Sequence, residues 1–539
     1  MDVCIIGAGP AGAILAAELA EREHAVVILD AGPRFDDTDR EKRMERELRP
    51  SFRRSDVWDM GGPRDAFSVS GPINYDMNAT RVKGVGGTTL HWQGQSQRLH
   101  PEDFEMESRH GVADDWPISY DDLEPYYTMA EQELGVAGAP SPFGGERSGP
   151  YPMEAHERSY LDQVLQAGFT SNDIELHACP MAINSQSYDG RPACQGFGTC
   201  NPVCPSRAKY SAEVHIDRAE AAGATIITNA PVARLAHDDA GERVTAAMID
   251  RPGTPDSVRA RTFVIAAGGI ETARLLLLSA SSSHPDGLAN GSGLVGRRFM
   301  EHPSVKLEAR LDKPSRQHLI GFDTSISEQY YGHDDGPTGS MVLQIDNDHG
   351  DTPAEAALAG GTTLNRMLNE PPGAALRQQT FGDALLDHVS DRYGHGIGIV
   401  AMVEQLPDPE NRITLSDDVT DDEGNPGPDL HFRVGSDTQE TLTNAMEVLS
   451  AIVDALPVSD VREIGTPRTP SFVFHHMGTA RMGEDRTNSV VDADLRAHEV
   501  DNLYLSSSAV FVTSGAAPPT LTIAALTLRL ADHLDERLS

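Results

Sequence analysis

Positive charge is scarce in this sequence. Of its 539 residues, 82 are Asp or Glu and only 44 are Lys or Arg, which gives a formal net charge of −38 at pH 7. Five of the 44 are lysines: Lys42, Lys83, Lys209, Lys306 and Lys313. A surface this negative repels phosphate backbones and anionic lipid headgroups. We therefore expect no nucleic-acid partner and no attachment to acidic membranes.

Long apolar runs are also missing. No stretch approaches the roughly 20 apolar residues of a transmembrane helix, so we expect no membrane span. The chain opens directly on a predicted strand, residues 2–6, rather than on a charged and apolar leader. Together these two absences predict a cytoplasmic protein.

Cysteine is rare and odd in number. The five are Cys4, Cys179, Cys194, Cys200 and Cys204. An odd count in a large chain without a leader argues against a framework of disulfides. Three of the five nevertheless fall between residues 194 and 204, and this clustering needs an explanation of its own.

The acidic residues run along the whole chain rather than gathering in one tail. One interpretation is an acidic docking face for a basic partner. The other, which we favour, is a halophilic protein, because salt screens self-repulsion and carboxylates keep the surface hydrated. On either interpretation the charge concerns the surroundings of the protein and not its chemistry. The length, in contrast, predicts at least two domains, because 539 residues exceed what one core supports.

Residues 2–31 follow the order strand, glycine turn, helix, strand. In the turn, Gly7 allows the tight bend, Gly9 lets the backbone approach a pyrophosphate, and Gly12 lets helix and strand pack closely. The helix N-terminus offers free N–H groups to phosphates. Asp30 stands 18 residues after Gly12, where it can accept hydrogen bonds from a ribose. The candidate dinucleotide-binding residues here are Gly7, Gly9, Pro10, Ala11, Gly12, Asp30 and Ala31.

Later segments resemble the glucose–methanol–choline (GMC) oxidoreductase family, and most closely the flavin subunits of its sugar and polyol dehydrogenases. The first is a glycine-rich loop that ends in His-Trp, and the others follow in the family's order along nearly the whole chain. These segments are residues 84–92, 118–127, 264–275, 294–303, 404–412, 475–479 and 502–534. The resemblance implies that the dinucleotide is FAD.

The family's fold then becomes the expectation: an α/β protein with a Rossmann-type FAD-binding domain assembled from separated segments, and an α+β substrate domain with an antiparallel sheet. We assign residues 1–57, 58–150 and 205–300 to the FAD-binding domain. Residues 151–204 would form a connection that carries the cysteine loop, 301–469 the substrate domain, and 470–539 a C-terminal FAD and catalytic segment. The strand-like run at 398–405 and the turn at 423–427 suit an antiparallel sheet.

The resemblance also implies further FAD contacts: Gly84, Gly86, Gly87, Thr88, His91, Val232, Pro519 and Thr520. In some relatives the histidine that matches His91 is bonded covalently to the flavin, whereas in others it only packs near the ring, and both alternatives stay open. Pro519 and Thr520 begin an apolar helix whose N-terminal dipole would face the flavin.

Oxidation of an alcohol needs a base for the hydroxyl proton and an acceptor for the hydride. The family's catalytic histidine opens a His-x-x-Gly-Thr segment, which implies that His475 is the base and that flavin N5 takes the hydride. His476 would orient substrate or only pack. The family's second His or Asn corresponds to Pro518, which has no side-chain donor or acceptor. Either His475 works alone, or another polar group such as His476 replaces the missing partner, or the substrate is not a simple alcohol.

The cysteine loop has the spacing Cys194-x5-Cys200-x3-Cys204, with glycines and prolines between the thiols. This composition suits an iron–sulfur cluster. The spacing resembles that of sugar-dehydrogenase flavin subunits that hold a 3Fe–4S cluster. Structural thiols and a local disulfide are the alternatives, and zinc lacks an evident fourth ligand.

A cluster would serve as an exit for electrons, so we favour a dehydrogenase that oxidises an alcohol, sugar or polyol and passes electrons to an acceptor protein or a quinone. An oxidase that uses oxygen is the second interpretation. The third is a flavin-bound electron-transfer subunit that lost alcohol chemistry when Pro518 replaced the polar partner.

Overall fold

The computed structural model describes residues 1–47, 58, 60–201, 203–249, 257–316, 320–332, 339–347 and 382–539. The domain boundary expected at residue 57 lies outside these ranges. Within them, no helix combines the length and the apolar character required to cross a bilayer.

A five-stranded parallel sheet forms the first unit, in the order β20-β11-β1-β2-β7. Its strands are rich in Val and Ile because helices cover a parallel sheet on both faces. The sequence predicted β1, β2 and the helix between them, and the structure confirms all three. The strands are β1 (Val3–Ile6), β2 (Val26–Leu29), β7 (Thr225–Ile227), β11 (Thr262–Ile265) and β20 (Leu503–Leu505).

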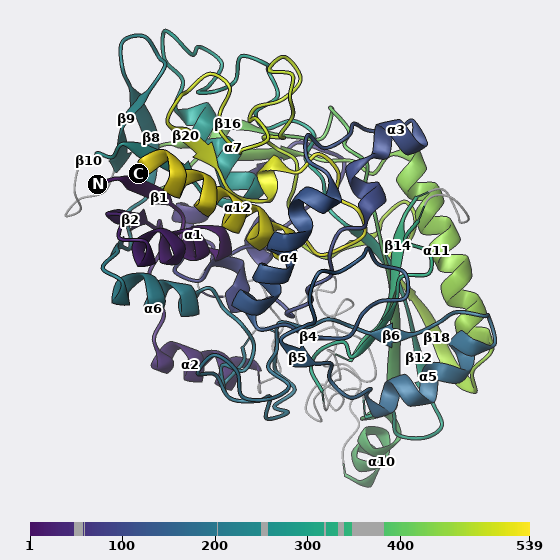
Figure 1. Cartoon of the computed structure of the whole chain (residues 1–539). Helices are drawn as coiled ribbons and strands as arrows, with labels where there is room; N and C mark the ends of the chain where they lie inside the picture. The colour runs from purple at the N-terminus through teal and green to yellow at the C-terminus, as the bar shows by residue number, and fades with distance from the viewer. Residues whose placement is uncertain are drawn as a thin grey trace.

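Helices from distant parts of the chain pack around this sheet. The C-terminal helix α12 lies between α1 and α4, and α6 packs on the other side of α1 (Figure 1). Pro519 immediately precedes α12, as the sequence predicted. The helices are α1 (Pro10–Glu21), α4 (Tyr120–Leu134), α6 (Glu213–Ala221), α7 (Gly268–Leu278) and α12 (Thr520–Leu538).

A seven-stranded antiparallel sheet forms the second unit, in the order β18-β12-β15-β14-β13-β6, with β19 also paired to β12. Helix α11 (Ser436–Asp454) lies along one face of the sheet and α5 (Tyr160–Thr170) packs against α11 (Figure 1). The strands are β6 (His177–Ala178), β12 (Pro303–Leu311), β13 (Ser325–Ser327), β14 (Met341–Ile345), β15 (Gly396–Val403), β18 (Val458–Ile464) and β19 (Ser471–Phe472).

The two units confirm the expected fold class. The stretch 151–204 does more than connect them, because α5 and β6 both belong to the second unit. Leu161, Leu165 and Phe169 of α5 are buried in the same apolar core as β12 and β15.

Smaller elements complete the chain. The turn expected near residue 425 joins β16 to β17 in a three-stranded sheet with β3, and a second small sheet has the order β10-β9-β8. These elements are α2 (Asp37–Glu47), β3 (Ser68–Val69), α3 (Met106–His110), β4 (Ala137–Gly138), β5 (Met153–Glu154), β8 (Val232–His237), β9 (Val244–Ile249), β10 (Ser257–Val258), α10 (Asp383–Arg392), β16 (Arg412–Thr420) and β17 (Pro426–His431).

Candidate active site

The turn between β1 and α1 is shaped by its glycines. Gly7 has a φ of +108°, and a Cβ there would lie 2.5 Å from the Ala266 carbonyl oxygen. A Cβ on Gly12 would lie 1.9 Å from the carbonyl oxygen of Gly7, so only glycine permits this approach of helix and strand. Gly9, at the N-terminus of α1, has no atom of the other described residues within 4 Å of its Cβ position, its chain neighbours aside. The turn therefore leaves open space directly in front of a helix N-terminus, where phosphate groups bind well.

A second glycine loop lies against the first. The amide of Gly86 donates to the Ala8 carbonyl at 2.9 Å, and a Cβ on Gly87 would lie 2.9 Å from the Cα of Gly9. Thr88 follows in a short 3-10 helix, and its carbonyl accepts the amides of His91 and Trp92 at 3.2 and 3.1 Å. The structure thus brings Gly86 and Gly87 into contact with the first turn, whereas Gly84 lies against Pro33 and Phe35 in the loop after β2 and Thr88 continues the second loop.

Asp30 ends β2 and is 6% exposed. Its carboxylate accepts the amide of Ala8 at 2.8 Å and that of Gly32 at 2.9 Å. These two bonds tie the turn after β1 to the turn after β2. Burial raises the pKa of Asp30. Each carboxylate oxygen retains a second lone pair that a ribose hydroxyl could use. Ala31 follows directly, and Val232 begins β8 and is half-buried.

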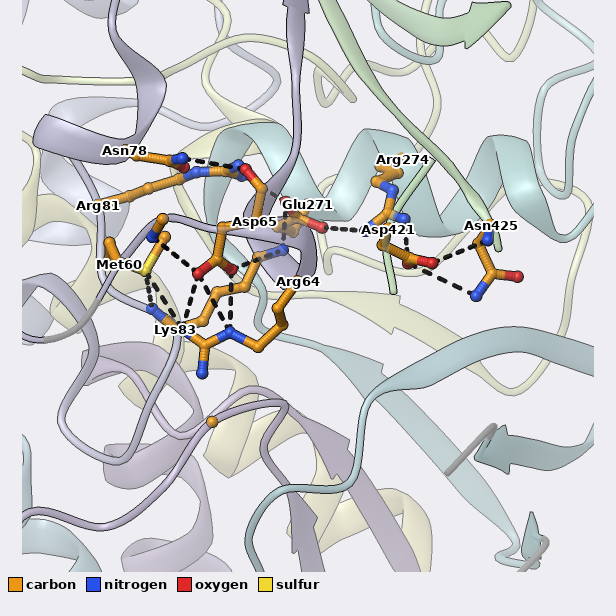
Figure 2. Close-up of polar contacts among 12 residues, drawn as sticks. Met60, Arg64, Asp65, Asn78, Arg81, Lys83, Glu271, Arg274, Asp421 and Asn425 are labelled. Atoms are coloured by element: carbon orange, nitrogen blue, oxygen red, sulfur yellow. Dashed lines mark hydrogen bonds and ion pairs between the residues drawn. The ribbon is translucent and has the colours of Figure 1, made fainter. Parts of the chain in front are cut away.

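A buried cluster of charges anchors the segment that leads into the second glycine loop (Figure 2). Glu271 of α7 binds Arg81, and its Oε1 lies 3.2 Å from Lys83 Nζ. Its Oε2 lies 3.3 Å from Arg274 Nη1, and Arg274 Nη2 reaches Asp421 at 2.6 Å in the turn between β16 and β17. Burial alone would raise the pKa of Glu271, but Lys83, Arg81 and Arg274 hold it well below its usual range.

His91 follows this loop and is 8% exposed. Its Nε2 has no hydrogen-bond partner among the described residues, and burial lowers its pKa to about 3. A buried ring nitrogen without a partner is costly in a protein that has nothing to bind there. The open glycine cradle and the unpaired His91 nitrogen both fit a large bound group with phosphates at one end and a polar ring system at the other.

His475 stands where the end of β19 meets the start of β12, because Phe472 pairs with Pro303. Its Nδ1 lies 2.8 Å from Nδ1 of His302, whose Nε2 contacts the Gly515 carbonyl at 2.9 Å. Burial, with His302 and His476 nearby, holds the pKa of His475 well below its usual range. The imidazole is therefore neutral near pH 7, which is the form that a general base requires.

Glu301 fixes the backbone around this histidine. Its Oε1 accepts the amide of His475 at 2.7 Å and that of His302 at 2.8 Å. Phe474, one residue before His475, has a φ of +72°, a strained value for an aromatic residue, and its side chain is 44% exposed. Strain of this kind persists where surrounding contacts impose it, and it concentrates at functional sites. Burial raises the pKa of Glu301 to about 7.

His476 contacts Tyr75. Tyr75 donates its hydroxyl to Glu301 and accepts from Nε2 of His476 at 2.8 Å. The ring of His476 also packs against Phe299, with centroids 5.8 Å apart. Burial lowers its pKa to about 3. These contacts suit a structural side chain, whereas the catalytic alternative for His476 stays a prediction.

The C-terminal segment completes the site. Pro518 and Pro519 are buried and Thr520 is the first residue of α12. Gly515, three residues before Pro518, has a φ of +52°, and a Cβ there would lie 2.5 Å from the Tyr331 hydroxyl. Pro518 offers no polar side chain, and the imidazole that lies next to His475 is that of His302. The C-terminal segment holds His302 through the carbonyl of Gly515.

The sequence motifs contained His302 and Glu301 but assigned them no role, and Tyr75 was missed altogether. One sequence signal could have indicated a role for Glu301 and His302. They form an adjacent Glu-His pair directly before an apolar strand, and polar residues at a strand end often face a functional site. Nothing in the local pattern around Tyr75 marks it.

The described residues give no support for an iron–sulfur cluster at the cysteine loop. Among the described residues, no group of three or more His, Cys, Asp or Glu side chains could hold a metal ion, and none of the five cysteines is in a disulfide. Lys209 instead packs the loop onto the protein: its ammonium binds the Cys200 carbonyl at 2.5 Å and the Trp92 carbonyl. Its amide donates to the Cys204 sulfur at 3.4 Å. The prediction of metal ligation by Cys194, Cys200 and Cys204 thus finds no support in the geometry.

Comparison with known families identifies the class. The GMC oxidoreductase models match residues 2–304 and 407–527. The chain belongs to the GMC oxidoreductase family, as the motifs implied, and it is an FAD-dependent oxidoreductase of alcohol-type CH–OH donors.

Among individual relatives, the large subunit of fructose dehydrogenase from Gluconobacter japonicus is 36% identical over 99% of this chain and 97% of its own length. The 2-methyl-1,2-propanediol dehydrogenase of Mycolicibacterium austroafricanum is 28% identical over 100% and 96%. The 6'''-hydroxyparomomycin C oxidase of Streptomyces lividus is 29% identical over 99% and 92%.

Solved structures share the fold at low identity. Pyridoxine 4-oxidase from Mesorbium loti aligns with a TM-score of 0.62 and 19% identity, over 99% of this chain and 98% of that one. Formate oxidase from Aspergillus oryzae aligns with a TM-score of 0.65 and 16% identity over the same shares.

Proposed function

We propose that this protein is a dehydrogenase that oxidises a CH–OH group of a sugar or polyol, with His475 as the general base and an acceptor other than oxygen. The observation that carries the proposal is the position of the His475 imidazole, which contacts His302 at one ring nitrogen and whose backbone amide is held by Glu301. Bound FAD would supply the acceptor for the hydride.

His475 would take the hydroxyl proton. Its Nε2 forms a bond to hydrogen as the substrate O–H bond breaks, while the C–H bond gives up its hydride and the carbonyl forms. A positioned base of this kind contributes about 10²- to 10⁴-fold to the rate. The pKa of His475, held below its usual range, keeps the base unprotonated at neutral and mildly acidic pH.

A polyhydroxyl substrate is supported by buried polar groups that lack partners. Gln97 is 1% exposed and neither atom of its amide has a partner among the described residues. Asp103 is fully buried, and burial raises its pKa well above the usual range. Its Oδ2 accepts the Tyr331 hydroxyl at 2.8 Å beside Gly515, while its Oδ1 is unpaired within the described part of the chain. Hydroxyl groups of a polyol can both donate to and accept from such groups.

A dehydrogenase is supported by the names of two relatives, fructose dehydrogenase and 2-methyl-1,2-propanediol dehydrogenase. The oxidase alternative is favoured by other relatives and neighbours, which are named oxidases. Cys194, Cys200 and Cys204 are given no role in this proposal, since no metal-binding group is found among the described residues.

The test is an anaerobic screen of sugars, polyols and simple alcohols for bleaching of the flavin absorbance. We expect a sugar or polyol to reduce the wild-type flavin, His475→Gln to slow reduction by on the order of 10³-fold, and His476→Gln to slow it less than tenfold. Reduction by simple alcohols alone would contradict the substrate class. Hydrogen peroxide formed in step with turnover in air would establish the oxidase instead.

A further inference from the structure

His302 makes two contacts that together determine which nitrogen of His475 carries a proton. The residue is fully buried and immediately precedes β12. Its Nε2 lies 2.9 Å from the carbonyl oxygen of Gly515, and its Nδ1 lies 2.8 Å from Nδ1 of His475. The rings of His302 and His475 are nearly perpendicular, at 89°, so the contact between them is not a stacking contact.

A carbonyl oxygen only accepts hydrogen bonds, so Nε2 of His302 must carry a hydrogen. Burial lowers the pKa of His302 to about 4, so the ring is neutral near pH 7 and has only this one hydrogen. Its Nδ1 therefore accepts, and the hydrogen in the contact between the two Nδ1 atoms belongs to His475. Neutral His475 then has a bare lone pair on Nε2.

We propose that His302 is a positioning residue that fixes the tautomer of His475 and makes Nε2 the basic nitrogen. This inference rests on the proposed function, in which His475 is the base. The carbonyl of Gly515 keeps the proton of His302 on Nε2. His475 therefore donates its Nδ1–H to Nδ1 of His302. When Nε2 takes the hydroxyl proton, the resulting imidazolium still donates Nδ1–H to His302, which stabilises the new charge.

Glu301 adds the second constraint. It holds the main-chain amides of both histidines, so that the two rings meet at a fixed distance and angle. The adjacent residues Glu301 and His302 therefore act on different parts of His475: the carboxylate orients its backbone, and the imidazole sets its protonation. His302 thereby takes over part of the task that Pro518 cannot perform, because it provides a polar partner for the catalytic ring rather than for the substrate.

The experiment compares His302→Leu with His302→Asn in the holoenzyme. Leu has similar bulk but no acceptor, whereas Asn places a carbonyl oxygen close to the former Nδ1 position. Stopped-flow flavin reduction should slow by on the order of 10²-fold in His302→Leu, with the half-saturating substrate concentration nearly unchanged. His302→Asn should recover the rate to within roughly tenfold of wild type. FAD content and flavin absorbance report whether each variant keeps its structure.

A second measurement does not depend on activity. Nitrogen-15 spectra of histidine-labelled wild-type holoenzyme, with the His475 signals assigned by their loss in His475→Gln, should show a protonated Nδ1 and a bare Nε2. The opposite tautomer, or an unchanged reduction rate in a folded His302→Leu, would overturn the inference while the proposed function stands. If no donor reduces the wild-type flavin, the proposed function fails, and the spectra still decide the tautomer.

Discussion

The glycine cradle and the cluster around His475 are made from different parts of the chain. The cradle consists of main-chain atoms from two glycine turns, which touch where Gly86 donates to Ala8 and where Gly87 passes Gly9. The cluster consists of side chains, in which His302, Glu301 and Tyr75 contact the two adjacent histidines. Binding of a common cofactor needs a backbone shape, whereas base chemistry needs particular ring atoms in particular protonation states.

Two buried carboxyl groups, Glu271 near the cradle and Glu328 in the antiparallel unit, have pKa values shifted in opposite directions. Near the cradle, Glu271 is held ionised by Lys83, Arg81 and Arg274. In the antiparallel unit, burial raises the pKa of Glu328 to about 7; its carboxylate accepts the Ser141 hydroxyl at 2.6 Å, and Nε2 of His177 lies 3.3 Å away. Cations thus keep Glu271 ionised, whereas the pKa of Glu328 lies close to neutral pH.

The largest effect is expected from disrupting the charge cluster around Glu271, which anchors the second glycine loop. Glu271→Gln should lower the free energy of unfolding by about 3–5 kcal/mol and reduce FAD retention, because three buried cations lose their shared partner. Glu105→Gln is the matched control, since its pair with Arg109 is half-exposed and contributes about 0–1 kcal/mol. Thermal unfolding and FAD content per chain measure both. Equal losses in the two variants would show that the buried cluster has no special role.

The second prediction concerns how the stability of the protein depends on pH through the carboxyl group of Glu328. Because the pKa of Glu328 rises from about 4.5 in the unfolded chain to about 7, its stabilisation is complete below pH 4.5 and is lost as pH rises through 7. That loss is about 3 kcal/mol, and Glu328→Gln, which never ionises, should not suffer it. Melting temperatures at pH 5 and pH 8 test this, with Glu440→Gln on the exposed face of α11 as control. A variant that tracks wild type at both pH values would refute it.

The glycines separate folding from cofactor binding within the cradle. Gly12→Ala should destabilise the apoprotein by about 1–3 kcal/mol, because its Cβ meets the Gly7 carbonyl. The Cβ of Gly9→Ala would meet no atom in the part of the chain that the structure describes, so the change should leave the apoprotein stable and weaken FAD binding instead. Melting of apoprotein and titration with FAD distinguish them. The reverse ranking would mean that the open space at Gly9 is not the FAD site.

The smallest expected effect concerns the cysteine loop. Cys194→Ser should change stability by about 0.5 kcal/mol or less and leave the visible absorbance and the rate of flavin reduction as in wild type. Iron analysis of both proteins completes the test. Iron in the wild type that disappears in the variant would restore the cluster interpretation.

The sequence could predict the cradle because its signals are local. Gly7, Gly9, Gly12 and Asp30 lie within one strand–helix–strand unit, and their roles follow from backbone geometry alone. The assignment of the chain to a family likewise followed from ordered motifs. His302 could not be predicted as the neighbour of His475, because their contact depends on the pairing of β12 with β19 and on the carbonyl of Gly515.

The prediction for the cysteines rested on their spacing alone, and the described residues give it no support. Their spacing resembled that of a cluster-binding loop, but spacing does not determine where three thiolates point. In the structure, Lys209 holds the loop through backbone carbonyls, a contact that no sequence pattern announces.

The strand order of the parallel sheet has a consequence for how the chain is made. Strand β20, which pairs with β11, is formed by residues 503–505. Helix α12, which packs on α1, follows β20 in the chain. During synthesis, the first strands leave the ribosome long before the partners that cover them. The nascent chain therefore carries an unpaired sheet edge and an uncovered apolar helix face through most of translation, and it should depend on chaperones until its last residues emerge.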